Sequence, residues 1–201
     1  MGLFKDENKY DHEILRAAQE EGVPFAVAKG FFALESAFNP KAYLEEKYAD
    51  PAKNDASYGL AQVLYRTARG MGYTGTPEGL FDPYTSAKYG ARFIAGLYKK
   101  YKSLPDTIAA YNMGRPRKAA ETTARIVGIY GKPLPDWVYA NQPYVDRVSA
   151  YIAYYQAAEK RDAGAAERIQ ILIKKKLLAS RRGIWQKLIS AIPWPPASSA
   201  R

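Results

Sequence analysis

Apolar side chains recur every three or four residues along most of the chain, which is the spacing of helices with one buried face. The helices expected from this spacing cover residues 11–21, 24–39, 67–70, 83–104, 106–111, 117–128, 141–158 and 163–192. The alternation typical of strands is nearly absent, apart from one small hairpin expected within residues 42–65. The pattern therefore predicts a mainly α fold without internal repeats.

Glycine and proline residues set the expected boundaries of these helices. Gly22 ends the first helix and Pro24 opens the second, because proline is favoured in the first turn of a helix. Pro40 stops the second helix, since the residue before a proline avoids the α conformation. Residues 72–83 read as a loop, and residues 133–135 read as a stiff connector to the last long helix of the main domain.

Composition narrows the chemistry that the chain can support. With 201 residues, the chain can form one sizeable core, or a core and an appendage. It contains no cysteine and a single histidine, His12, so disulfides and thiolate sites are excluded and a Ser-His-Asp triad is hard to build. A metal cluster is equally hard to build with one histidine. The sequence shows no secretory signal at its start and no apolar run long enough to cross a bilayer.

Charge divides the chain into two parts. The net charge is +10, and residues 159–201 account for +7 of it, from ten basic and three acidic residues. We expect an enzyme-sized domain at residues 1–158 and a basic amphipathic helical arm at residues 159–201, which ends in a Pro/Ser/Ala-rich tail. The helix of residues 163–192 carries an apolar stripe and bends at Gly183. Such an arm can pack on a partner protein or on the domain itself, or bind a membrane or envelope surface. The apolar stripe argues against nucleic acid as the partner.

Glu35 stands out because it is a carboxyl group in the otherwise apolar segment of residues 31–38. Helical spacing places Phe31 and Phe38 on its face. Apolar surroundings raise the pKa of a carboxyl group, and a glutamic acid that stays protonated near neutral pH can act as a general acid. The alternative is a glutamate at a helix end that reaches water past its neighbours.

Four short segments follow one another in a recognisable order. They are Glu35-Ser36-x-Phe38-Asn39-Pro40, Ser57-Tyr58-Gly59-Leu60-Ala61-Gln62, Ala109-Ala110-Tyr111-Asn112-Met113-Gly114 and Pro143-Tyr144-Val145-Asp146-Arg147-Val148. Together they resemble the soluble-type lytic transglycosylases, whose catalytic domain is similar to goose-type lysozyme. The resemblance covers roughly residues 10–157 and implies a lysozyme-like fold.

The resemblance also implies which residues form the glycan-binding cleft. They are Glu35, Ser36, Ser57, Gly59, Gln62, Tyr111, Asn112 and Tyr144. In this interpretation Gly59 lets the backbone approach the sugar and Gln62 hydrogen-bonds it. Tyr111 orients the catalytic carboxyl group, Asn112 fixes a loop or contacts an N-acetyl group, and Tyr144 completes the site. Each of these residues also has a purely structural interpretation, as a turn, a cap or a core ring.

The chain departs from the usual pattern of the family in three places. Ala61 replaces the methionine usually found between Leu60 and Gln62, and we expect the smaller side chain to open the glycan groove or to weaken its affinity. Residues 138–142 lack the glutamate that often precedes the last tyrosine, which puts a secondary carboxylate in doubt. Residues 41–56 are a somewhat long insertion that can shape the substrate site.

Most glycosidases use two carboxyl groups, and the candidates for a second one, Asp50 and Asp55, lie in a turn-rich segment. The resemblance implies a reaction that needs only one. Glu35 protonates the glycosidic oxygen that leaves N-acetylmuramic acid, and then takes a proton from the C6 hydroxyl of that sugar. The C6 oxygen attacks C1 and closes a 1,6-anhydro ring, so the substrate supplies its own tethered nucleophile. The implied protein is a peptidoglycan lytic transglycosylase, and the implied reaction needs no metal and no cofactor.

We expect a phage enzyme, carried in the virion or released to the host periplasm at lysis. Residues 163–192 would then contact tail or capsid proteins or a membrane surface. Two alternatives remain open: a hydrolytic lysozyme of the same fold, and a virion structural or peptidoglycan-binding protein without turnover.

Overall fold

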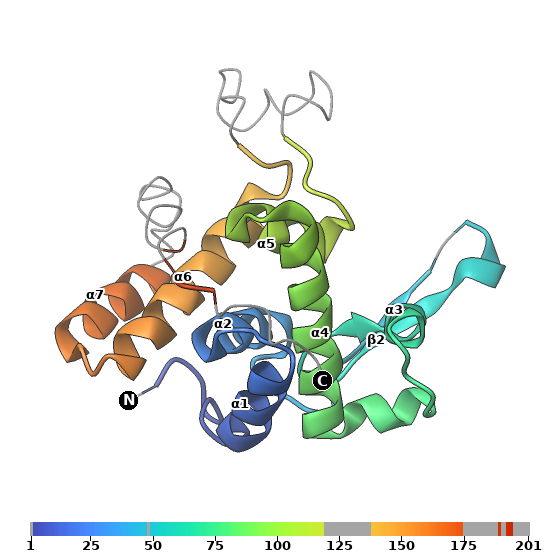
Figure 1. Cartoon of the computed structure of the whole chain (residues 1–201), viewed down its shortest axis with the longest axis horizontal. Coiled ribbons are helices and arrows are strands. Elements are labelled where there is room, and N and C mark those ends of the chain that lie inside the picture. The colour runs from blue at the N-terminus through green and yellow to red at the C-terminus, as the bar shows by residue number, and fades with distance from the viewer. Residues whose placement is uncertain (1, 48, 119–137, 175–188, 190–191, 195–201) are drawn as a thin grey trace.

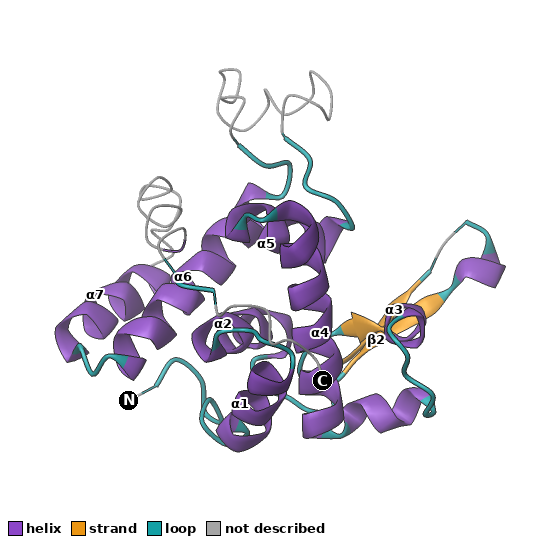
Figure 2. Ribbon diagram, viewed as in Figure 1, coloured by secondary structure: helices purple, strands orange, loops and turns teal. Residues whose placement is uncertain are grey.

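The computed structural model describes residues 2–47, 49–118, 138–174, 189 and 192–194. These residues form a helical body with one small sheet at its edge (Figures 1 and 2). The elements are α1 Asp11–Glu20, α2 Phe25–Ser36, β1 Tyr43–Glu46, η1 Pro51–Lys53, β2 Asp55–Tyr58, β3 Val63–Leu64, α3 Tyr65–Gly70, η2 Pro77–Phe81, α4 Pro83–Tyr101, α5 Leu104–Met113, α6 Gln142–Glu159 and α7 Ala163–Lys174. The predicted mainly α class is confirmed.

Helix α2 lies at the centre of the body because nearly all of its side chains are apolar. Its residues from Ala26 to Ala33 are buried, and it packs closely against α6. A Cβ atom at Gly30 would lie 2.4 Å from Cγ1 of Ile152, so the glycine lets the two helices approach each other. A core helix therefore carries Glu35 in its last turn.

The end of α2 differs from the prediction. The helix was expected to reach residue 39 but ends at Ser36, because Ala37 and Phe38 adopt left-handed backbone conformations with φ of 50° and 63°. The prediction that Phe38 shares the face of Glu35 by helical spacing is therefore wrong. The ring of Phe38 is buried and packs edge-on against Phe4 and Tyr155.

Helix α4 connects the body to the sheet. Pro83 stands in its first turn, and the Asp82 side chain caps it by accepting a hydrogen bond of 2.8 Å from the backbone N–H of Thr85. Gly90 allows a close approach to the segment before β3, since a Cβ atom there would lie 2.4 Å from the Cβ of Ala61. The helix η2 lies within residues 72–83, which were expected to be loop.

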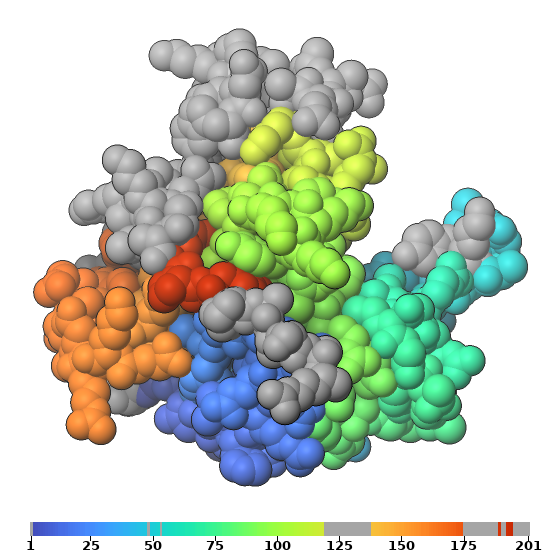
Figure 3. Space-filling model, in the orientation of Figure 1, coloured from blue at the N-terminus to red at the C-terminus, as the bar shows by residue number. Residues whose placement is uncertain are grey.

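The strands β1, β2 and β3 form an antiparallel sheet in that order, in the region where a hairpin was expected. Leu44 pairs with Ser57 and Ser57 pairs with Leu64, so these side chains share one face. Tyr43 and Tyr58 lie on the opposite face with their rings in contact. The β1–β2 hairpin is the 41–56 insertion, and its tip projects from the body (Figure 3).

The helix expected at residues 117–128 lies outside the described residues from residue 119 onward. Lys118 forms an isolated antiparallel bridge with Tyr139, and the backbone N–H of Ala140 donates a 2.8 Å hydrogen bond to the carbonyl of Arg117. The two ends of segment 119–137 thus lie side by side at the start of α6.

The C-terminal residues that the structure describes pack on the body. Three apolar side chains of α7, Ile169, Leu172 and Ile173, contact Ala150 and Ala153 of α6. Ile189 is buried, and the ring of Trp194 stacks on that of Tyr98 with 3.8 Å between centroids and an interplanar angle of 5°. The rest of the expected helix at 163–192 lies outside the described residues. Among the described helices, none combines the length and apolarity needed to cross a bilayer.

Candidate active site

Glu35 occupies the last turn of α2, where its carboxyl group is largely removed from water. Burial raises the pKa of Glu35 from 4.5 to about 7, and a hydrogen bond from the hydroxyl of Tyr144 opposes this rise. Tyr144 stands in the first turn of α6 and donates to Oε1 of Glu35. Burial and the nearby carboxylate raise the pKa of Tyr144 well above its usual value, so its hydroxyl remains a donor.

Tyr111 lies close to Glu35 but bonds elsewhere. Its hydroxyl donates a 2.7 Å hydrogen bond to the backbone carbonyl of Ala61, and its ring packs between Phe31 and Phe93. Burial, and secondarily the charge of Glu35, raises the pKa of Tyr111 well above its usual value. Tyr144 therefore makes the hydrogen bond to the Glu35 carboxyl group that was expected of Tyr111. Tyr111 instead joins α5 to the segment before β3.

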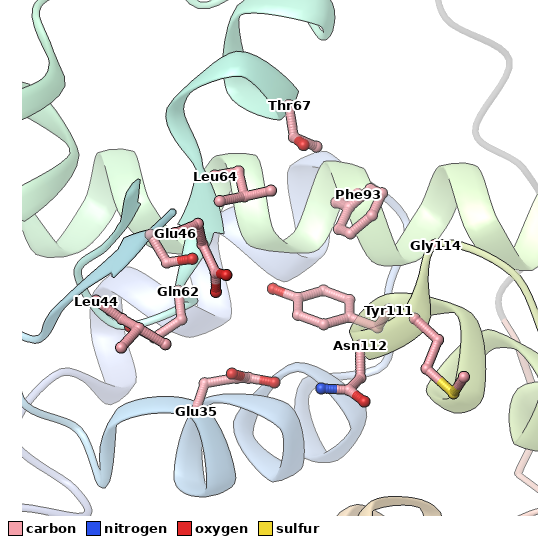
Figure 4. Close-up of a pocket in the computed structure, with 12 residues that line it drawn as sticks. Glu35, Leu44, Glu46, Gln62, Leu64, Thr67, Phe93, Tyr111, Asn112 and Gly114 are labelled. Carbon is pink, nitrogen blue, oxygen red and sulfur yellow. The ribbon is translucent and has the colours of Figure 1, made fainter. Parts of the chain in front are cut away.

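A cleft of about 480 Å³ opens in front of Glu35, within the size range of sites for small ligands. Its walls are the inner face of the sheet, α4, and the end of α5, with Glu35 at its base (Figure 4). The residues that line it are Glu35, Leu44, Glu46, Ser57, Gln62, Leu64, Thr67, Phe93, Tyr111, Asn112, Met113 and Gly114.

The segment of residues 59–62 forms one wall through backbone geometry. Gly59 has φ of 69°, and a Cβ atom there would lie 2.2 Å from the carbonyl oxygen of Leu80 and 2.6 Å from Oγ of Ser86. The glycine is therefore required by packing inside the protein, and Gly59 is absent from the cleft lining. Its approach to a sugar stays a prediction. The Gln62 side chain lines the cleft while its Nε2 donates 3.0 Å hydrogen bonds to the carbonyls of Ala42 and Gly59.

The two predicted serines and the predicted asparagine have different surroundings. Ser36 lies outside the cleft lining, and its Oγ donates a 2.9 Å hydrogen bond to the Leu60 carbonyl, which ties α2 to the wall. Ser57 lines the cleft from the middle strand. Asn112 is exposed in the cleft, and its Oδ1 accepts a 3.0 Å hydrogen bond from Nδ2 of Asn141.

Ala61 does not open the groove, contrary to the expectation from the sequence. Its side chain is fully buried and lies against Gly90, and it does not line the cleft. A small residue fits here because α4 passes so close that even a Cβ atom at position 90 would collide with it.

Sequence reasoning missed several residues of the cleft: Leu44, Glu46, Leu64, Thr67, Phe93, Met113 and Gly114. Glu46 is the most consequential, because it brings a second carboxyl group into the cleft. The two aspartates considered for that position are structural: Asp50 caps η1, and Asp55 accepts hydrogen bonds from the backbone of Ala56 and Arg66. The alternation of side chains along a strand at residues 43–46 is the signal that could have indicated Glu46. In the described part of the chain, no three His, Asp or Glu side chains cluster so as to hold a metal ion.

A buried carboxyl group at the end of a core helix, facing a small antiparallel sheet across a cleft, is consistent with a lysozyme-like fold. The family model described as the transglycosylase SLT domain matches residues 13–125. The match covers more than half of the chain, and the chain belongs to this family, whose members are lytic transglycosylases acting on peptidoglycan. Neither the curated proteins nor the solved structures include a significant match.

Proposed function

We propose that this chain is an active lytic transglycosylase, which cleaves the β-1,4 bond between N-acetylmuramic acid and N-acetylglucosamine and leaves a 1,6-anhydro ring. The observation that carries the proposal is the environment of Glu35. Burial raises the pKa of its carboxyl group to about 7, so that near neutral pH both its protonated and its ionised forms are accessible. A residue that must act first as an acid and then as a base requires this balance.

In the proposed reaction that one carboxyl group acts twice. Protonated Glu35 gives its proton to the glycosidic oxygen, and the bond from C1 to that oxygen breaks. The N-acetyl oxygen of the muramic acid stabilises C1 while the leaving sugar departs. Ionised Glu35 then removes the proton of the C6 hydroxyl, and the C6 oxygen bonds to C1. No water is consumed, and Glu35 recovers its proton.

Tyr144 contributes most in the middle of this sequence, when Glu35 is negatively charged. Its hydroxyl donates to Oε1 of Glu35, and hydrogen bonds to an ionised group are stronger than those to a neutral one. We propose that Ser57, Gln62 and Asn112 contact the glycan, because they line the cleft. Ser36, Gly59 and Tyr111 then act indirectly, by holding the helix end and the wall in place.

Glu46 supports a second candidate function, the hydrolytic lysozyme. A second carboxyl group in the cleft is what a mechanism with an activated water requires. The two reactions are separated by the mass of the products released from purified sacculi, since anhydro ends are lighter than reducing ends by one water. We expect anhydro ends.

The decisive comparison uses three proteins: wild type, Glu35→Gln, and the control Glu167→Gln on the exposed side of α7. Removal of a general acid typically costs about a hundredfold or more in rate, so Glu35→Gln should release almost no soluble glycan while Glu167→Gln matches wild type. Wild-type binding to sacculi without any release would instead indicate a protein that binds peptidoglycan without turnover.

We further propose that residues 1–158 form the catalytic domain, that residues 159–201 form the arm, and that the enzyme serves a phage in genome delivery or in host lysis. The apolar side chains of α7 that face α6 support an arm that packs on its own domain. Four basic residues of the arm that the structure describes as exposed are then available to contact virion proteins or an anionic envelope surface: Lys160, Arg161, Arg168 and Lys174. Mass spectrometry of purified virions tests whether the enzyme is carried in the virion. If the chain is absent from purified virions, the role in host lysis is left.

A further inference from the structure

Glu46 is placed by the register of the sheet on the side that faces the cleft. Leu44 shares a face with Ser57 and Leu64, and Glu46 lies two residues farther along the same strand, so its side chain points the same way. Figure 4 shows its carboxylate directed into the cleft from the wall opposite the helix that carries Glu35. Its neighbour Glu45 lies on the other face of the strand and is exposed.

The carboxylate of Glu46 has no partner among the side chains that the structure describes. The side chains that the structure describes give it no hydrogen bond and no ion pair, although the adjacent Glu45 pairs with Lys47 at 3.2 Å. The described residues that line the cleft include no lysine or arginine, even though the chain carries 30 of them and a net charge of +10. The cleft is thus an acidic hollow in a cationic protein.

Glu46 does not form a coupled pair with Glu35. The pKa of Glu35 is set by burial and by the Tyr144 hydroxyl, and the charge of Glu46 is not among the causes of its shift. A carboxylate that projects into a cleft, unpaired and independent of the catalytic acid, is available to a group on the ligand. A cation with N–H donors satisfies it best, because charge-assisted hydrogen bonds are the strong ones.

We propose that Glu46 binds a primary ammonium group of the substrate, and that it makes this enzyme favour peptidoglycan that carries free amines. The proposal rests on the proposed function, because it concerns the substrate of the same cleft. Two parts of peptidoglycan can supply the ammonium group. One is a glucosamine residue left by N-deacetylation of the glycan, and the other is the side-chain amine of a diamino acid in the stem peptide.

The test compares wild type, Glu46→Gln and the matched control Glu45→Gln on native sacculi and on sacculi whose amines have been chemically acetylated. Assays are run at low salt and at a pH where amines are protonated. Acetylation should lower the wild-type kcat/KM by about threefold to tenfold, the range expected for a half-exposed charge-assisted contact. Glu45→Gln should behave as wild type, whereas Glu46→Gln should digest both substrates at the same, lower rate.

Additional assays identify the source of the amine. Glycan strands stripped of stem peptides are compared before and after partial N-deacetylation, and a preference that persists in these strands assigns the amine to the sugar. A preference seen only with intact stem peptides assigns it to the diamino acid. Equal sensitivity to acetylation in wild type and Glu46→Gln overturns the proposal, and so does a wild type that is indifferent to acetylation. A wild type that releases no glycan from any substrate refutes the proposed function instead.

Discussion

Replacing Tyr144 with phenylalanine removes the hydroxyl that donates a hydrogen bond to Oε1 of Glu35 and keeps the ring in place. That hydrogen bond lowers the pKa of Glu35, whereas burial raises it. Loss of the hydrogen bond should therefore raise the pKa further. We therefore expect the carboxyl group of Glu35 to hold its proton more strongly in Tyr144→Phe than in the wild type.

The size of the effect follows from the strength of the lost contact. A hydrogen bond to an ionised group contributes about 1.5 to 3 kcal/mol, and about 1.4 kcal/mol corresponds to tenfold in an equilibrium constant. The ionisation of Glu35 should therefore shift by about tenfold or more toward the protonated form. The maximal rate should fall as well, since the carboxyl group loses the contact that orients it.

The assay is the pH dependence of kcat/KM on purified sacculi. Glu35 must be protonated to begin the reaction, so wild-type activity should fall as the pH rises through about 7. In Tyr144→Phe this fall should occur at least about one pH unit higher. The control is Tyr111→Phe, whose lost hydroxyl bonds to the carbonyl of Ala61. It should lose about 1 to 2 kcal/mol of stability and keep the wild-type pH dependence. A pH profile of Tyr144→Phe that is unchanged or shifted to lower pH would contradict this role of the Tyr144 hydroxyl.

Three further predictions concern stability. Burial makes the ionised form of Glu35 unfavourable in the folded protein, so the stability that protonated Glu35 contributes is complete below pH 4.5 and is lost as the pH rises to about 7. Above that range, thermal unfolding should show Glu35→Gln more stable than wild type by no more than about 3 kcal/mol. The difference should vanish in acid. In α4, Gly90→Ala places a Cβ atom 2.4 Å from a core side chain, whereas Gly96→Ala meets open space. Urea unfolding should therefore show that Gly90→Ala loses about 1 to 3 kcal/mol of stability and that Gly96→Ala gains about 0.5 to 1 kcal/mol. Equal effects of the two substitutions would contradict the packing described. A double-mutant cycle on the stacked pair Trp194 and Tyr98 should give a coupling energy of about 0.5 to 1.5 kcal/mol, and a value near zero would show that the C-terminal segment does not dock.

Most helix positions could be predicted because proline, glycine and apolar spacing act locally. Helix α4 begins at Pro83 as its sequence indicates, and α6 lies within a residue of its expected bounds. The end of α2 could not be predicted from the same signals, because Ala37 and Phe38 take left-handed conformations that neither residue type favours. Tertiary packing decides such a conformation.

The sequence indicated the candidate site where a polar residue stood in an apolar segment. It was less informative where the site depends on contacts between residues that are far apart in the sequence. Glu35 was singled out because a carboxyl group stood in an apolar segment, and the resemblance of the four segments assigned it the catalytic role. Its hydrogen bond to Tyr144 joins residues 109 positions apart, and nothing local indicates which tyrosine makes it. Gly59 was expected to let the backbone approach a sugar, and the sequence could not show that the Leu80 carbonyl lies where a Cβ atom of this residue would be. Glu46 was missed because the register of the sheet decides which face of β1 looks into the cleft.

The central claim is that the folded protein keeps the carboxyl group of Glu35 protonated close to neutral pH. The most direct test is an NMR titration of the wild type with ¹³C-labelled glutamate carboxyl groups, in which the Glu35 resonance is assigned by comparison with Glu35→Gln. We expect a midpoint at about pH 7 for this resonance. A midpoint at or below 4.5, the value of an ordinary glutamate, would contradict it.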